Sequence, residues 1–290
     1  MIWLNAVVQG LLLGGLYAIF ACGLSLMFGV MRLVNLAHGD LSVLGAYAAY
    51  VLVEHLGGNP LWTFAAIVPL AALVGYAMQR LLLDRALAAG ELSPLLVTFG
   101  LSIIIQNLLQ QGFGANDQAL NIGNFGYSSW EITPNLYLGQ FEVLVFGTAV
   151  AVLVGLQLFL SRTRQGRLLR ATADNPRAAA LSGVDTKRAR ATATAIALST
   201  VAIAGLFLAM RTSFTPTAGS DDLIFAFEAV IIGGLGSLWG TLLGGLVLGV
   251  AQTVGSQINP ADGILAGHIV FLAVLALRPR GILAPRGAMA

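Results

Sequence analysis

Charge is what this sequence has least of. Only 10% of its 290 residues are Asp, Glu, Lys or Arg, whereas 57% are apolar, and the mean hydropathy is +0.84. Soluble domains average about 25% charged residues, so these side chains are too few to solvate the surface of a soluble protein of this length. Disordered chains are rich in charge and poor in apolar residues, which excludes disorder. The composition therefore predicts a polytopic membrane protein.

Cysteine and lysine, two residue types with specific chemistry, are almost absent. The single cysteine, Cys22, excludes a disulfide within the chain and a cysteine-based metal site. The phosphate-binding loop of ATPases needs Gly-Lys before Ser or Thr, and the only lysine, Lys187, lacks that setting. The histidines His38, His55 and His268 lack metal-ligand spacing. We therefore expect no metal, no cofactor, no catalytic residues and no enzyme activity, and any ATP hydrolysis must occur on another polypeptide.

Apolar segments fill most of the chain. A membrane helix needs about 20 mostly apolar residues. The sequence offers about eight such stretches, at 4–31, 33–53, 61–79, 92–109, 141–160, 191–210, 223–258 and 264–277. The stretch 223–258 is too long for one straight helix, and its glycines predict a break. We expect an all-α polytopic fold with some broken or re-entrant segments, forming a single transmembrane domain over residues 1–290.

The cations are concentrated in three places, which predicts the orientation in the membrane. They lie around 80–85, throughout 162–190 and within 278–286. The loops 112–139 and 212–222 hold no cation but carry acidic residues. By the positive-inside rule, the three basic places are cytoplasmic and the two acidic loops are external.

The sequence leaves the two ends of the chain open. A cytoplasmic Arg32 gives two crossings before residue 53 and an external N-terminus, whereas re-entry of 33–40 moves the N-terminus inside. After the external 212–222 loop, an odd number of crossings must reach the cytoplasmic C-terminus. Three short crossings and one crossing with re-entrant pieces both satisfy this requirement.

The basic region 162–190 contains a short helix with clear start and stop signals. Asp174 or Asn175 suits its N-cap, Pro176 suits its first position, and Gly183 suits the left-handed position just past its end. The residues between are strong helix formers, and its small face consists of Ala178, Ala179 and Ala180. This helix fits a groove on a soluble partner. The alternative is an ordinary amphipathic surface helix, drawn to an anionic leaflet by its arginines.

Three runs of residues resemble one family of membrane proteins. The run 170–185, RATADNPRAAALSGVD, resembles the coupling-helix segment of ABC-importer permeases, and it is most similar to the branched-chain amino acid permease family. The runs 29–40, GVMRLVNLAHGD, and 233–240, GGLGSLWG, also resemble that family. The likeness extends over nearly the whole chain. Arg177 stands where the general importer signature has Glu, so no role of that Glu is carried over.

The resemblance implies a multi-pass permease of the bacterial inner membrane that works by alternating access. The implied partners are a second homologous permease, two cytoplasmic ATPase subunits and an extracytoplasmic solute-binding protein, with no nucleic acid. Branched-chain or related amino acids are the implied substrates, but urea and amide permeases belong to the same wider family. An ion-coupled secondary transporter is the alternative of a different class, although the sequence has no convincing internal repeat.

Polar residues inside apolar stretches are candidates for lining the translocation path. Asn35, His38 and Asp40 are costly at membrane depth unless they face protein or water, and Gly39 permits a break in the helix. The alternative is that this break lies in solvent at the cytoplasmic interface. Glu228 is expected to reach water near the outer surface. Four residues at the predicted break in 223–258 are candidates for the same path: Gly233, Gly234, Gly236 and Ser237.

Overall fold

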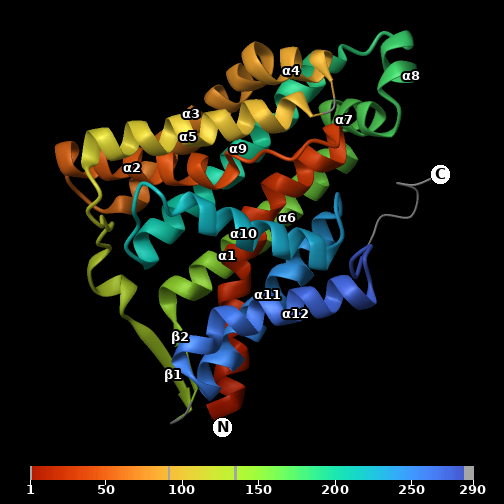
Figure 1. The fold of residues 1–290 in the computed structure, drawn as a ribbon. Helices are drawn as coiled ribbons and strands as arrows, with labels where there is room; N and C mark the ends of the chain where they lie inside the picture. The colour runs from red at the N-terminus through yellow and green to blue at the C-terminus, as the bar shows by residue number, and fades with distance from the viewer. Residues whose placement is uncertain (1, 91, 134–135, 284–290) are drawn as a thin grey trace.

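Long apolar helices form most of the computed structural model, which describes residues 2–90, 92–133 and 136–283 (Figure 1). The α-helices are α1 (Ile2–Met31), α2 (His38–Leu56), α3 (Thr63–Met78), α4 (Asp84–Ala89), α5 (Ser93–Phe113), α6 (Gln140–Arg162), α7 (Arg164–Asp174), α8 (Pro176–Leu181), α9 (Thr186–Arg211), α10 (Gly219–Gly233), α11 (Leu238–Ile258) and α12 (Gly263–Leu277). Seven helical stretches in the described ranges are long and apolar enough to cross a membrane. The predicted all-α polytopic class is therefore confirmed.

Short turns and one small hairpin complete the described chain. A π-helical turn, η2 (Gln79–Leu83), joins α3 to α4. Three 3-10 turns are η1 (Pro60–Trp62), η3 (Gly123–Gly126) and η4 (Pro260–Asp262). Strands β1 (Ser129–Thr133) and β2 (Leu136–Gly139) pair antiparallel, with Ser129 opposite Gly139. The hairpin was not predicted from the sequence, and it lies within the loop expected to be external.

The two predicted sides of the membrane correspond to two ends of the structure. Arg190 in the basic region pairs with Asp84 of α4, with Nε and Oδ1 2.9 Å apart, so two of the basic places meet. At the other end, the acidic loops pair through backbone hydrogen bonds between Gln118 and Phe214, 3.0 and 2.8 Å long. This grouping agrees with the topology predicted from the charges.

The orientation of α1 answers the question that the sequence left open. Near its start, Gln9 donates to the carbonyl of Tyr137 in β2 over 2.6 Å. Near its end, Val30 packs against the buried cluster of Leu169, Ala189 and Ala193, and the end of α1 lies beside α7 in Figure 1. On the sidedness predicted from the charges, this orientation places the N-terminus on the external side. The stretch 223–258 is broken at 234–237 as predicted: α10 ends at this turn, and the candidate membrane spans α11 and α12 follow it.

Helices α1 and α9 are the most buried of the long helices, and α1 owes its position to glycine. A Cβ added to Gly14 would lie 2.6 Å from the carbonyl oxygen of Gly245 in α11, and one added to Gly245 would lie 2.6 Å from that of Gly14. Small residues let helix backbones approach this closely. The outer helices α5 and α12 expose large apolar side chains such as Leu108 and Leu272, as expected where lipid or a partner covers them.

Candidate functional site

The helix breaks between α1 and α2, and polar groups stabilise the break. The Asn35 side-chain oxygen accepts the N–H of Ala37 over 3.1 Å, and the hydroxyl of Thr98 in α5 accepts the N–H of Leu36 over 3.2 Å. Asn35 is fully buried. Backbone that leaves the helix at membrane depth persists only where its polar groups find partners within the protein or in a water-filled cavity. Asn35 therefore supports the bend from inside.

His38 places this break deep in the molecule. Its ring Nε2–H donates to the carbonyl of Phe20 over 3.0 Å, and the ring lies against Gly23, both on α1. At about 1.5 Å per residue, these two residues lie about 12 to 16 Å before the end of α1 at Met31. His38 is fully buried. The alternative of a break in solvent at the cytoplasmic interface is therefore wrong.

The first turns of α2 and α10 touch each other at this depth. A Cβ on Gly39 would collide with the carbonyl oxygen of Gly219, and one on Gly219 would lie 2.5 Å from the backbone nitrogen of Asp40. Across the same contact, Ser42 donates to the carboxylate of Asp222 over 3.3 Å. Two interrupted helices thus begin side by side inside the protein, an arrangement that transporters use around a binding site.

Asp40 connects this buried contact to an exposed polar surface. Its Oδ1 accepts from Gln106 Nε2 of α5 over 2.8 Å, and the same nitrogen lies 3.3 Å from the hydroxyl of Ser220. Asp40 is 2% exposed, Gln106 is half-buried and Ser220 is exposed. Gln106 lies seven residues before the end of α5 at Phe113, about 10 Å along the axis. We define Asp40, Gln106 and Ser220 as the polar cluster, in which Asp40 is buried behind the other two side chains.

Charge and exposure together restrict what this surface can face. Within the described ranges, neither Asp40 nor Asp222 forms a salt bridge. Further along the same helix, Asn107 and Gln110 of α5 are exposed as well. Polar side chains at membrane depth face a water-filled cavity or another protein rather than hydrocarbon. The polar cluster can therefore offer hydrogen bonds and a carboxylate to a polar solute.

The predicted glycine group does not lie with Asp40. Gly233 ends α10, whereas Gly219 begins it, so the two are about 20 Å apart along the axis. Gly234 and Gly236 have φ values of +107° and +81° and form the turn into α11, and the hydroxyl of Ser237 accepts the N–H of Gly240 over 3.1 Å. These predicted path residues thus form a tight turn and are not brought to the polar cluster.

Glu228 corrects a second expectation. It does not reach water: it is 4% exposed, and its Oε1 lies 2.5 Å from Nδ1 of His268 on α12. Nearby, the hydroxyl of Tyr17 donates to Gln252 of α11 over 2.5 Å. These two polar pairs tie α10 to α12 and α1 to α11. The sequence could not indicate either pair, because their members are 40 and 235 residues apart.

The predicted helix in the basic region is present as α8, and its caps are resolved. Asn175, not Asp174, is the N-cap, since its side-chain oxygen accepts the N–H groups of Arg177 and Ala178 over 3.1 and 3.0 Å. Gly183 has a φ of +82°, and the N–H of Val184 donates to the carbonyl of Ala179 over 3.0 Å. This is the Schellman arrangement that closes a helix.

The exposed face of α8 differs from the predicted one. Ala179 is 6% exposed and packs inward, whereas Ala178 and Ala180 are exposed and Leu181 is 91% exposed. Leu181 was missed as a site residue, although it is the one large apolar side chain in α8. A leucine presented to water on a short capped helix marks the face that a partner can cover.

The segments on either side hold α8 firmly. In α7, Leu169 is buried against Ala189 and Ala193 of α9. After α8, Asp185 caps α9 by accepting the N–H of Arg188 over 3.0 Å. That hydrogen bond holds the pKa of the Asp185 carboxyl below its usual range, so the cap stays anionic at neutral pH. The helix is therefore fixed at both ends rather than carried on a loose loop.

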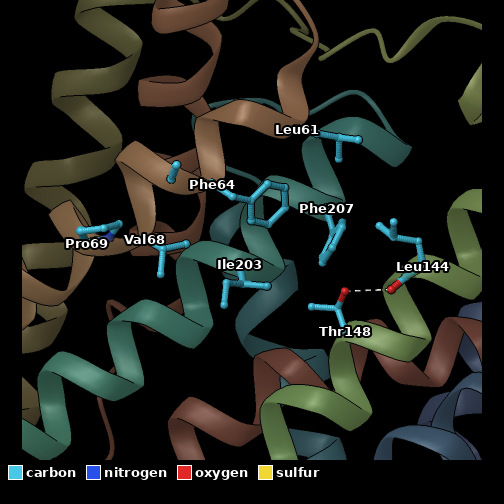
Figure 2. A pocket seen from close by; sticks show the side chains of 9 residues that line it. Leu61, Phe64, Val68, Pro69, Leu144, Thr148, Ile203 and Phe207 are labelled. Carbon is cyan, nitrogen blue, oxygen red and sulfur yellow. Dashed lines mark hydrogen bonds between the residues drawn. The ribbon is translucent and has the colours of Figure 1, made fainter. Parts of the chain in front are cut away.

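A wide hollow on the surface lies elsewhere and is apolar. Figure 2 shows it between α3, α6 and α9, with a volume of about 600 Å³. The rings of Phe64 and Phe207 pack together beside it, with centroids 4.8 Å apart. Its polar side chain, Thr148, donates to the carbonyl of Leu144 over 2.8 Å (Figure 2). The hollow offers no free polar group to a polar solute.

Comparisons with known proteins identify what this architecture is similar to. The family model of the permease component of the branched-chain amino acid transport system matches residues 6–276. The high-affinity branched-chain amino acid permease BraD of Pseudomonas aeruginosa is 30% identical, over 97% of this chain and 95% of its own length. In Salmonella typhimurium, LivH is 26% identical over 97% of this chain and 95% of its own length. LivM of the same organism is 25% identical over 92% of this chain and 68% of its own length. No solved structure matches.

Proposed function

The chain belongs to the branched-chain amino acid permease family, and from this premise we propose that it imports branched-chain or related amino acids as one transmembrane subunit of an ABC importer. Its relatives BraD and LivH carry that transport activity in their names. The polar cluster is the observation that carries the proposal, because a carboxylate and an amide at membrane depth suit a zwitterionic solute. The ion-coupled alternative gains no support from these relatives.

The polar cluster lines the translocation path in this proposal. Gln106 and Ser220 present their polar groups at the surface of the path, and the buried Asp40 carboxylate lies directly behind Gln106. Asn35, His38 and Gly39 hold the bend that brings Asp40 there. Conversion between inward-open and outward-open states moves the first turns of α2 and α10 relative to α5, which alternately exposes the cluster to the two sides.

The partners follow from what the chain contains and what it lacks. It has no phosphate-binding loop, so two cytoplasmic ATPase subunits supply the energy and engage α8. Two permeases of one organism, LivH and LivM, are both similar to this chain, which supports pairing with a second homologous permease. A solute-binding protein delivers the amino acid on the external side, where the hairpin of β1 and β2 lies.

Uptake by the reconstituted complex tests the transport activity. We expect ATP-dependent uptake of leucine, isoleucine and valine in competition assays that also include amides and urea. Uptake driven by an ion gradient without ATP would contradict the proposal. Preference for urea or amides would retain the importer but replace its substrate.

Replacing Asp40 tests the path. Asp40→Leu removes the carboxylate from the cluster, and we expect uptake to fall strongly while the complex still assembles. The matched control is Asp117→Leu, since Asp117 is an exposed acid in the external loop. Unchanged uptake by Asp40→Leu at equal expression would remove the polar cluster from the path.

The exposed leucine of α8 tests the coupling role. Leu181→Glu introduces a charge that would be buried and unpaired at a contact, so we expect loss of ATPase binding in a pull-down and loss of uptake. Leu92→Glu is the control, because Leu92 is also an exposed leucine, 72% accessible, near the basic end. Normal binding and uptake by Leu181→Glu would show that α8 is only a surface helix.

A further inference from the structure

An irregular helical turn lies at the basic end, away from both the polar cluster and the exposed face of α8. The helical stretch from α3 to α4 contains the π-helical turn Gln79–Leu83. Such turns are rare and often occur at functional sites. Here the turn leaves Gln79 completely buried, and its side chain contacts α9.

Four side chains form a continuous hydrogen-bonded network across this contact. Thr194 of α9 donates to Gln79 Oε1 over 2.7 Å, and Gln79 Nε2 donates to Asp84 Oδ1 over 3.1 Å. Arg190 of α9 donates its Nε–H to the same Asp84 oxygen over 2.9 Å. The side chains of Asp84 and Arg190 are 9% and 20% exposed. Water therefore screens this ion pair much less than a pair on the surface.

The network involves the beginning of α9, which follows α8 closely along the chain. The Schellman cap at Gly183 closes α8, and Asp185 then caps α9, so that Val184 alone separates the two caps. Arg190 lies in the second turn of α9. A displacement of α8 is therefore passed to the beginning of α9 without a flexible linker.

Close packing continues from this network toward the polar cluster. A Cβ on Gly75 of α3 would lie 2.8 Å from the carbonyl oxygen of Thr194, so α3 and α9 are in backbone contact beside the network. Further along α9, the backbone of Gly205 touches Ser42 in α2, two residues after Asp40. Packed helices with short links of this kind transmit small displacements as rigid bodies.

We propose that Asp84 is a positioning residue for transport, which by holding both Arg190 and Gln79 makes the α3–α4 stretch and α9 move as one body with α8. This inference rests on the proposed role of α8. Without the Asp84 charge, α9 follows α8 while the α3–α4 stretch lags behind. ATP hydrolysis then continues, but a smaller fraction of the hydrolysed ATP drives movement of the helices around the polar cluster.

The experiment measures uptake and ATP hydrolysis together in proteoliposomes that hold the complete complex. Asp84→Asn keeps the size of the side chain but removes its charge. Because coupling energies between sites typically correspond to about 5-fold to 150-fold effects, we expect the uptake per ATP hydrolysed to fall about 5-fold or more. ATPase subunits should stay bound. Asp262→Asn, an exposed acid in η4, is the control and should leave the ratio unchanged.

Each other outcome overturns the proposal. An unchanged ratio would show that the ion pair is not needed for coupling. Loss of ATPase binding by Asp84→Asn would show that Asp84 only shapes the loop that carries α8. The proposed role of α8 is tested separately by Leu181→Glu. Normal uptake by that variant would contradict the role of α8.

A second variant covers the case in which Asp84→Asn does not accumulate. Asp84→Cys and Arg190→Cys are combined in a Cys22→Ala background, and a short bis-thiolsulfonate reagent joins the two cysteines by forming a disulfide with each thiol and releasing sulfinate. We expect the joined protein to regain the normal ratio and to lose it on reduction. A ratio that stays low in the joined protein would overturn the proposal, because the two helices would then be tied together without effect.

Discussion

The chain leaves the helix at 32–37, between α1 and α2, and again at 234–237, between α10 and α11, and the two breaks differ in how their backbone groups are satisfied. At the first break, side-chain oxygens of Asn35 and Thr98 accept backbone N–H groups. At the second, the carbonyls of Ile232 and Gly233 accept from the backbone N–H groups of Ile282 and Leu283, over 2.8 and 2.9 Å.

This difference has a functional consequence. A break supported by side chains collects polar residues inside the membrane, and one of them, Asp40, reaches an exposed surface through Gln106. The break at 234–237 is supported by a distant backbone segment, and its one polar side chain, Ser237, is used to cap α11. Both breaks provide partners for backbone N–H and C=O groups, because such groups without a hydrogen bond are strongly destabilising at membrane depth. The first break suits the translocation path and the second suits a turn.

Gly39→Ala should have the largest effect of the changes that separate the two breaks. The added Cβ would collide with the carbonyl oxygen of Gly219, a backbone atom that cannot rotate away. We expect the variant not to accumulate as folded protein in membranes. Gly45→Ala is the control on the same helix, because its nearest neighbours would be 3.7 Å away. Equal accumulation of the two variants would show that the α2–α10 contact is loose.

Asn35→Ala tests the support of the first break. The change leaves the buried N–H of Ala37 without a partner, and a buried unsatisfied group costs about 3 kcal/mol at the upper end of the usual range. Asn121→Ala removes the same kind of bond, a 2.7 Å contact to the N–H of Gly123, from an exposed loop. Water replaces that bond, so its loss should cost about 0.5 kcal/mol or less. Denaturation in mixed micelles compares the two, and equal costs would contradict a dry environment at Asn35.

Much of the fold was accessible from the sequence, because lipid imposes a strong pattern on composition. The stretches 92–109 and 141–160 correspond closely to α5 and α6, and the break in 223–258 follows from its glycines. The hairpin at 129–139 was missed, since a short external ribbon leaves no comparable pattern. The direction of α1 was also inaccessible, because it depends on the distant contact between Gln9 and Tyr137.

The site residues that neighbouring residues in the sequence mark out were predicted. Those that depend on contacts between distant helices were missed. Asn35, His38 and Asp40 stand out as polar residues within an apolar run, and Asn175 and Gly183 are helix boundary residues with known preferences. Which face of α8 is exposed depends instead on how α7 and α9 hold it, so Ala179 was placed outside and Leu181 was overlooked. Gln106 was not identified, because an amide near the end of an apolar helix is common on outer surfaces.

Truncation tests the support of the second break. A chain that ends at Arg280 loses the two backbone hydrogen bonds from Ile282 and Leu283. At about 1 kcal/mol for each bond, we expect the free energy of unfolding to fall by about 2 kcal/mol. A chain that ends at Leu283 keeps both bonds and serves as the control. If both truncated chains unfold at the same denaturant concentration, the C-terminal segment does not stabilise the turn.

The smallest effects, of opposite sign, should come from two glycines that face each other at the second break. Gly236 has a φ of +81°, and an alanine there costs about 1 kcal/mol because its Cβ disfavours the left-handed conformation. Gly29 lies in the last turn of α1, and its Cβ would sit 3.5 Å from the Cα of Gly236, an ordinary contact. Alanine in a helix is favoured over glycine by about 1 kcal/mol, so Gly29→Ala should stabilise the protein slightly. The double variant places both Cβ atoms in one gap, so its loss of stability should exceed the sum of the single effects. Denaturation gives the change in unfolding free energy for each of the three variants. If the change in the double variant equals the sum of the two single changes, α1 does not contact the turn.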